Sequence, residues 1–269
     1  MDAAELYRAG RLGQAIDAAT AAVKAKPADL TGRGFLAELL CIAGNLDRAD
    51  AQLEIVTNQQ PKAAVGVSLL RQLIRAARSR QEFFQAGRVP EVLKHPSESM
   101  RLSLEAWAMT RSGERAKAAE LLRAAEAARP NPAGQRNGEP FVGVRDLDDL
   151  FAGVVEVLTS TGKYYWVPLE HVVRLLPRKP ERPIDLLWLP AEMTVRGGPD
   201  GVVYLPCIYG NTGVQDGDAL LLGRSTEWDD SPEGVVRGRG QRMFLVGDHD
   251  LSILDLGELT FADDDAGNG

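Results

Sequence analysis

The chain has 269 residues, of which 44% are hydrophobic and 26% charged, so it is long enough for two cores and too apolar to be wholly disordered. Its formal net charge is −7, unevenly spread: residues 1–130 carry 19 basic and 15 acidic side chains, and residues 131–269 carry 12 and 23. An acidic total without a dense Lys/Arg patch argues against nucleic acid as the main partner.

A repeat of about 34 residues organises the first half of the chain. Prolines stand at separations of 34, 35 and 34 residues, at Pro27, Pro61, Pro96 and Pro130. Glycines and alanines recur five residues apart, as Gly10 and Ala15, Gly44 and Ala49, Gly113 and Ala118. Each Gly suits a tight turn between two helices, each Ala permits close helix packing, and each Pro ends a helix. This period is typical of tetratricopeptide-type (TPR) hairpins, and predicts a TPR-like helical repeat domain over residues 1–130.

The third unit of this repeat, near residues 65–96, departs from the pattern. Its turn is expected at Arg78 or Ser79, where the other units have Gly. Pro90 is expected to break its second helix early. We therefore predict a degenerate hairpin in the middle of the array.

The pattern changes after residue 130. Pro, Asn and Gly are dense in residues 131–140, which predicts a short linker. Short β-branched and aromatic runs then predict a mainly antiparallel, strand-rich α+β domain over residues 141–262. Two hairpins are expected, one pairing Val154–Leu158 with Tyr164–Val167, the other Met193–Arg196 with Val202–Tyr209. The acidic residues 263–269 are predicted to form a disordered tail. The expected fold class is thus α + (α+β), a helical-hairpin array before a strand-rich domain.

Three segments of the second domain have less regular patterns. Glu170–Leu176 is predicted to be a short helix that ends at Pro177. The apolar run Ala219–Leu222 is predicted to be a strand. Val235–Arg239 is rich in glycine and is expected to be a loop.

No group of residues points to catalysis. Gly162-Lys163 lacks the other residues of a phosphate loop, neither cysteine has a neighbouring His, and the acidic clusters do not match a calcium loop. We expect no enzyme activity, no cofactor and no metal site. The N-terminus lacks a signal-peptide pattern, and no apolar run approaches the roughly 20 residues that span a bilayer. A cytoplasmic protein without membrane contact is expected.

Several blocks of the second domain carry a family resemblance. They are Gly162-Lys163-Tyr164-Tyr165-Trp166-Val167-Pro168, Asp185-Leu186-Leu187-Trp188-Leu189-Pro190-Ala191, Leu222-Gly223-Arg224-Ser225-Thr226-Glu227-Trp228 and Gly240-Gln241-Arg242-Met243. In order and spacing, together with the N-terminal repeats, they resemble the ImpE/SciE/TagJ accessory proteins of bacterial type VI secretion systems. Leu189 departs from the polar or basic residue expected there.

The resemblance implies a non-enzymatic adaptor with two protein partners. Proteins similar to this one bind the small subunit of the contractile sheath through a helix at that subunit's N-terminus. They also associate with the ClpV-type AAA+ ATPase that disassembles contracted sheaths. Composition and spacing alone do not point to these partners.

A helical-hairpin array offers a surface for such a helix. The first helix of each unit lines the concave side, where an amphipathic helix can bind through apolar anchors. Aligning the units predicts a protein-binding groove made by Tyr7, Phe35, Glu38, Leu69, Arg75, Leu104 and Trp107. Packing between the repeats or against the second domain is the competing interpretation for Leu69, Leu104 and Trp107. A general TPR-type peptide-binding co-chaperone, and a hydrolase with unrecognised carboxylates, are the alternative functions.

Overall fold

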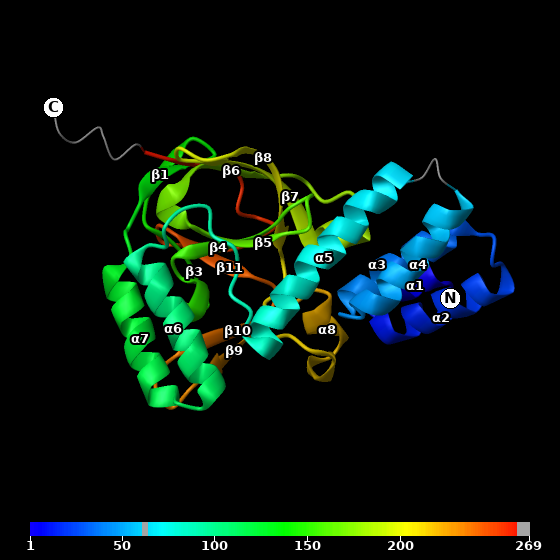
Figure 1. The fold of residues 1–269 in the computed structure, drawn as a ribbon, viewed down its shortest axis with the longest axis horizontal. Coiled ribbons are helices and arrows are strands. Elements are labelled where there is room, and N and C mark those ends of the chain that lie inside the picture. The colour runs from blue at the N-terminus through cyan, green and yellow to red at the C-terminus, as the bar shows by residue number, and fades with distance from the viewer. Residues whose placement is uncertain (61–63, 263–269) are drawn as a thin grey trace.

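The computed structural model describes residues 1–60 and 64–262, and its first half is helical (Figure 1). The helices are α1 (Ala3–Arg8), α2 (Leu12–Ala25), α3 (Leu30–Ile42), α4 (Leu46–Gln59), α5 (Ala64–Ala86), α6 (Glu98–Ser112) and α7 (Arg115–Ala128). Three antiparallel hairpins are formed, by α1 with α2, α3 with α4, and α6 with α7. The predicted helical hairpins are confirmed at these three places.

The repeated Gly and Ala residues have the backbone conformation and the burial that the repeat predicts for them. The turn residues Gly10, Gly44 and Gly113 have φ values of 77°, 74° and 86°, which side chains with a Cβ rarely adopt. Ala15 and Ala49 have no exposed surface, so the two helices of each hairpin approach closely there. Each hairpin therefore follows from local sequence.

The third unit is not a hairpin, which corrects the prediction. α5 runs without interruption for 23 residues, and neither Arg78 nor Ser79 is in a turn. The segment around them consists mainly of Ala, Arg and Gln, which favour helix, and it contains no Gly or Pro. The helix ends before Gly87, which has φ 75°, so Pro90 lies outside it. A single long helix therefore separates the first two hairpins from the third.

The second half consists mainly of strands. These are β1 (Ala133–Arg136), β2 (Glu139–Val142), β3 (Val144–Asp146), β4 (Val154–Leu158), β5 (Tyr164–Pro168), β6 (Val172–Pro177), β7 (Trp188–Val195), β8 (Asp200–Pro206), β9 (Thr226–Asp230), β10 (Val236–Gly240), β11 (Met243–Val246), β12 (His249–Ser252) and β13 (Leu259–Phe261). Eight strands form one sheet in the order β2-β1-β13-β6-β7-β8-β4-β5, beside sheets of three strands, β12-β11-β3, and two, β10-β9. Every pairing of these strands is antiparallel, so the predicted fold class is confirmed.

Both predicted hairpins are present, as β4 with β5 and β7 with β8. Residues 131–140, expected as a short linker, instead contain β1 and the start of β2, and β1 pairs with β13 inside the large sheet. The predicted tail, residues 263–269, lies outside the described residues.

Three predictions in this half are wrong. Glu170–Leu176 is not a helix, because after the short 3-10 turn η3 (Leu169–His171) the chain continues as β6. Ala219–Leu222 is not a strand but belongs largely to the helical turn α8 (Asp218–Leu221), since four apolar residues fit either structure. Val235–Arg239 is not a loop. It forms most of β10, where a Cβ on Gly238 would lie 2.3 Å from the ring of Tyr209.

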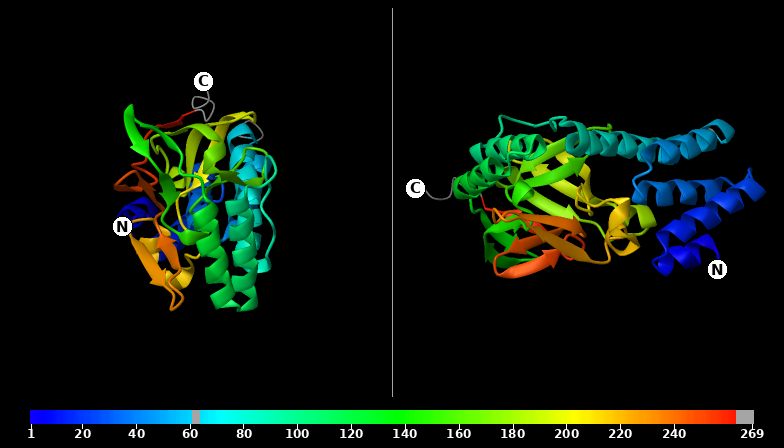
Figure 2. Two further views of the ribbon diagram at one scale, coloured as in Figure 1. Left: turned by 90° about the vertical axis from the view of Figure 1, so that its left-hand side faces the viewer. Right: turned by 90° about the horizontal axis from the view of Figure 1, so that it is seen from below.

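The helices and the sheets form two layers. Seen from below, α5, α6 and α7 lie along one side of the strands, and α1–α4 extend beyond the end of the sheet (Figure 2). Trp166 of β5 faces the helices in one apolar core, and its neighbour Val167 belongs to a second core on the other face of the sheet. α5 packs on β4 and β5 at one edge of the sheet, and the α6–α7 hairpin contacts the 3-10 turn η2 (Asp149–Phe151) just before β4.

Candidate functional site

The predicted groove residues of α1 and α3 lie together. The Tyr7 ring meets the Phe35 ring edge to face, with centroids 6.3 Å apart. Both side chains are half-buried and pack against the apolar core of the first two hairpins. Glu38 lies one helical turn after Phe35 and is buried, with 7% of its surface exposed. We call Tyr7, Phe35 and Glu38 the guest face, because they are the part of the predicted groove that the structure brings together.

The strand-rich half contacts this guest face through two arginines. Arg182 donates a hydrogen bond from Nη2 to Oε1 of Glu38, 144 residues away in the sequence. Arg224 donates from Nη2 to the backbone oxygens of Tyr7 and Arg8, at 3.1 and 3.0 Å, at the C-terminal end of α1. The 3-10 turn η4 (Pro183–Leu186), which follows Arg182, contacts α3. The guest face is therefore covered in part by the chain itself.

The other predicted groove residues lie elsewhere. Leu69 is half-buried and Arg75 exposed, both on α5, and Arg75 lies beside Gly162 of the β4–β5 turn. Leu104 and Trp107 are half-buried on α6, at the far end of the molecule from α1. The Trp107 indole donates from Nε1 to the backbone oxygen of Phe83 at 3.0 Å and stacks on that ring at 5.4 Å. The seven residues thus line three separate places rather than one continuous groove, because α5 interrupts the array.

A buried ion pair that was not predicted from the sequence joins α5 to the sheet. Arg80 of α5 donates from Nε and Nη2 to the two carboxylate oxygens of Glu156 on β4, both at 2.8 Å. Arg242 and the Tyr164 hydroxyl donate to the same carboxylate. Burial by itself would raise the pKa of Glu156, but Arg80 and Arg242 hold that pKa at about 2. Glu156 is therefore ionised and paired at neutral pH.

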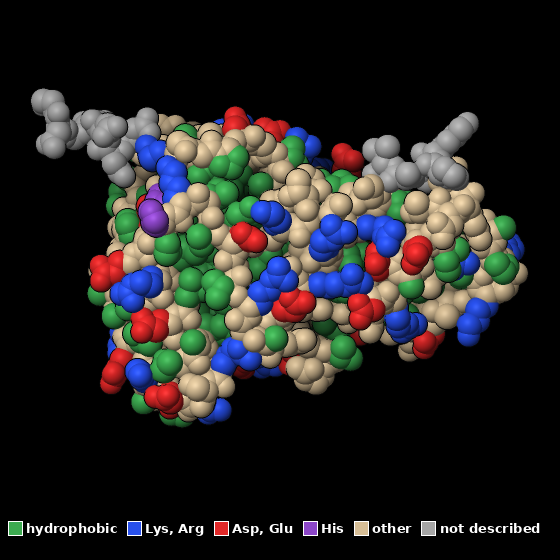
Figure 3. All heavy atoms as spheres, viewed as in Figure 1, with side chains coloured by type: hydrophobic (Ala, Val, Ile, Leu, Met, Phe, Trp, Pro, Cys, Tyr) green, Lys and Arg blue, Asp and Glu red, His purple; other side chains and the backbone are tan. Residues whose placement is uncertain are grey.

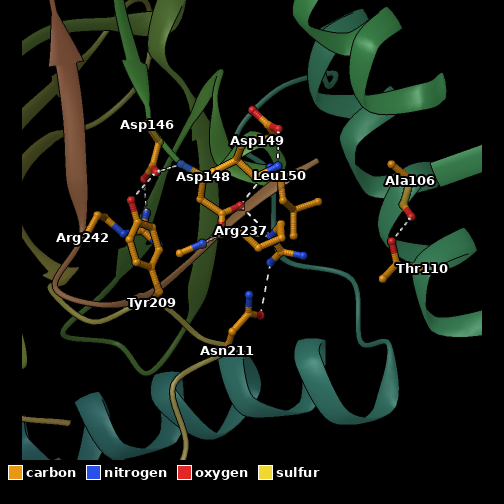
Figure 4. Close-up of polar contacts among 12 residues, drawn as sticks. Ala106, Thr110, Asp146, Asp148, Asp149, Leu150, Tyr209, Asn211, Arg237 and Arg242 are labelled. Atoms are coloured by element: carbon orange, nitrogen blue, oxygen red, sulfur yellow. Dashed lines mark hydrogen bonds and ion pairs between the residues drawn. The ribbon is translucent and has the colours of Figure 1, made fainter. Parts of the chain in front are cut away.

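A second group of buried charges continues from Arg242 (Figure 4). Arg242 Nη1 lies 3.2 Å from Oδ2 of Asp146, whose Oδ1 accepts hydrogen bonds from the Asp148 backbone and the Tyr209 hydroxyl, each at 2.8 Å. Arg237 of β10 donates from Nε to both oxygens of Asp148. Burial raises the pKa of Asp146 to about 7 and also raises that of Asp148. We refer to these charged side chains as the ion cluster: Arg80, Asp146, Asp148, Glu156, Arg237 and Arg242.

The ion cluster contains two carboxyl groups with separated pKa values, Asp146 and Glu156, as a hydrolase would need. Neither side chain has exposed surface, and both share one arginine, Arg242. A substrate cannot reach them in this conformation. The cluster therefore holds elements together, and one sequence signal pointed to it: Glu156 stands alone in an otherwise apolar strand, where a charge must find a partner.

Two of the hollows beside the helices also border the strand-rich half. One of about 600 Å³ lies between the α6–α7 hairpin and the β9–β10 pair, with Leu122, Asn211, Asp229 and Arg237 among its lining residues. The other, of about 300 Å³, lies between the α3–α4 turn, α5 and the strand-rich half. Within residues 1–60 and 64–262, no three His, Cys, Asp or Glu side chains are grouped to hold a metal. Over the same residues, no helix has the length and apolar character needed to span a bilayer.

The fold and these contacts define a two-part protein in which helical hairpins are joined to an antiparallel strand-rich domain by buried ion pairs. The family described as ImpE protein matches residues 138–260. The type VI secretion system accessory component TagJ of Pseudomonas aeruginosa is 35% identical over 266 residues, 99% of this chain and 93% of that protein. A crystal structure of a Vibrio parahaemolyticus protein matches with a TM-score of 0.91 and 30% identity, over 97% of this chain and 98% of the other. The chain belongs to the ImpE/TagJ family of type VI secretion accessory proteins.

Proposed function

We propose that this protein is a non-enzymatic cytoplasmic adaptor of a type VI secretion system. In this role it binds the small subunit of the contractile sheath, through the N-terminal helix of that subunit, and links it to the ClpV-type AAA+ ATPase. The observation that carries the proposal is the 35% identity with TagJ across 99% of the chain, which leaves no domain of this chain unmatched.

The helical hairpins support this proposal physically. Two stacked hairpins present the half-buried rings of Tyr7 and Phe35 on one side, and such rings are frequent anchors for a bound helix. The carboxylates of the ion cluster are closed to solvent and paired with arginine, which is the arrangement of a structural core rather than of a reacting site.

The test is a pulldown of the sheath small subunit with the full chain, with and without the N-terminal helix of the subunit. We expect the complete subunit to be retained and the truncated subunit to be lost. If the complete and the truncated subunit were retained equally, the N-terminal helix would not be what this protein binds. Retention of many unrelated peptides as well would instead favour the general co-chaperone.

The link to the ATPase is tested separately by adding the ClpV-type protein to the immobilised binary complex. We expect a ternary complex that contains both partners. If the ATPase and the small subunit exclude one another from the chain, the protein is not a bridge between them.

A further inference from the structure

The segment that covers the guest face resembles a bound ligand in its chemistry. Arg182 places a guanidinium on the buried carboxylate of Glu38. Directly after it, Ile184 is buried and Leu187 half-buried in the same apolar core as the first two hairpins. Arg224 adds two hydrogen bonds to the end of α1. We call Arg182, Ile184, Leu187 and Arg224 the internal latch.

The ion pair of the internal latch is more exposed to solvent than the ion pair at α5. The Arg182 side chain is 60% exposed, whereas the Arg80 side chain, which pairs with Glu156, is 14% exposed. Exposed ion pairs are weak because water solvates both partners once they separate. The space next to the latch is also incompletely filled, because the cleft of about 300 Å³ includes Leu187 and the α3–α4 turn.

Opening the latch has one defined cost. Glu38 is 7% exposed and pairs with Arg182, so it would lose its cation when Arg182 leaves. In the open protein water can solvate this carboxylate, but a bound helix would exclude that water, so the helix itself must supply a replacement cation. The guest face therefore selects a segment with apolar side chains beside one Lys or Arg.

We propose that the internal latch occupies the site of the partner's helix, and that a guest helix carrying apolar anchors and one basic side chain displaces it. This inference rests on the proposed function and specifies its binding site. The guest replaces Ile184 and Leu187 with its own apolar side chains, and its cation takes the place of Arg182 on Glu38. Basic side chains also gather over α5 on the face shown in Figure 3. Two arginines of α5, Arg71 and Arg78, are not part of this site, since they pair with Asp50 and Asp47.

The test measures the affinity of the full chain for the sheath small subunit after removal of the latch arginine. Arg182→Ala removes the competing cation and is expected to tighten binding by about threefold or more, since more of the protein is then open. Arg178→Ala is the matched control, because Arg178 is also an exposed arginine but pairs with Glu192 on the sheet. The control is expected to bind like the wild type.

A second variant tests whether the bound helix contributes a basic side chain that pairs with Glu38. In the Arg182→Ala background, Glu38→Gln removes the carboxylate without a competing latch, and is expected to weaken binding by about tenfold. Hydrogen exchange of the amides of residues 182–187 provides an independent measurement on the wild type. Exchange there is expected to become faster when the small subunit binds.

The outcomes separate the two proposals. Equal binding by the wild type and Arg182→Ala, with unchanged exchange at 182–187, overturns displacement and leaves the proposed function standing. Tighter binding by Arg182→Ala without any effect of Glu38→Gln overturns the requirement for a basic side chain. Absence of binding by the wild type and all variants overturns the proposed function and this inference with it.

Discussion

Two of the junctions between the helices and the strand-rich half differ in how deeply their charges are buried. At α5 the pair Arg80–Glu156 has side-chain exposures of 14% and 0%, and Phe83 packs between the rings of Trp107 and Trp166 at 5.4 and 5.1 Å. At α3 the pair Arg182–Glu38 has exposures of 60% and 9%. The first junction is therefore expected to be permanent, and the second to open within the folded protein.

This difference separates two roles within one helical region. α5 and the α6–α7 hairpin serve as part of the core, because their inner faces supply Phe83, Met100 and Ala106 to it. The first two hairpins extend beyond the sheet and contact it through the internal latch. The helical region thus combines a part packed against the sheet with a part that extends beyond it.

The largest effect is expected from the aromatic centre of the α5 junction. Phe83 is 2% exposed, so Phe83→Ala leaves a cavity and should lower the free energy of unfolding by about 3–5 kcal/mol. Urea denaturation measures this loss. Phe35→Ala is the control, since Phe35 is half-buried and should cost less. Equal losses would show that the two junctions are equally well packed.

Removal of the buried arginine comes next. Arg80→Ala leaves the carboxylate of Glu156 with Arg242 as its remaining arginine, and should lower the free energy of unfolding by about 3 kcal/mol. Arg71→Ala breaks a more exposed pair with Asp50 and should cost no more than about 1 kcal/mol. The same denaturation experiment compares them, and a loss no greater than that of Arg71→Ala would contradict a permanent junction at α5.

A smaller effect is expected from pH. The pKa of Asp146 rises on folding from 3.8 to about 7, so between these values the folded protein binds a proton that the unfolded chain has released. Stability should therefore fall as pH rises from about 4 to about 7, and the melting temperature with it by a few degrees. Asp146→Asn should remove this slope. If the melting temperature of the wild type rose over this range while that of Asp146→Asn did not, the raised pKa of Asp146 would be contradicted.

The smallest effect on stability is expected at the latch. Arg182→Ala breaks a pair whose arginine is 60% exposed, and should change the free energy of unfolding by less than about 1 kcal/mol. Thermal or urea denaturation checks this value. A loss as large as that of Arg80→Ala would place the latch in the permanent core and would count against its displacement by a partner.

Features set by neighbouring residues were predictable from the sequence. Gly10 and Gly44 mark turns because a positive φ is a local requirement, and the β4–β5 hairpin follows from two short β-branched and aromatic runs. The fold class could therefore be predicted. The continuity of α5 could not, because the period of 34 residues suggested a turn that no residue near Arg78 enforces.

The site depends on contacts between residues far apart in the chain. Glu38 was predicted to face a protein-binding groove, but its partner Arg182 is 144 residues away and belongs to no motif. Glycines in Val235–Arg239 suggested a loop, whereas Gly238 serves to let β10 approach the ring of Tyr209. Such long-range requirements leave little trace in local sequence.

The most direct test compares the Phe35→Ala variant with the wild type. The quantity measured is the dissociation constant between the full chain and the sheath small subunit. Phe35 lies on the guest face, so its truncation should weaken binding by about tenfold, as loss of an aromatic anchor does. Leu121→Ala, which shortens a half-buried apolar side chain on α7, is the control and should leave the constant unchanged. Titration calorimetry gives both values. Unchanged binding by Phe35→Ala, measured at a temperature where the variant is still folded, would contradict a binding site on the first two hairpins.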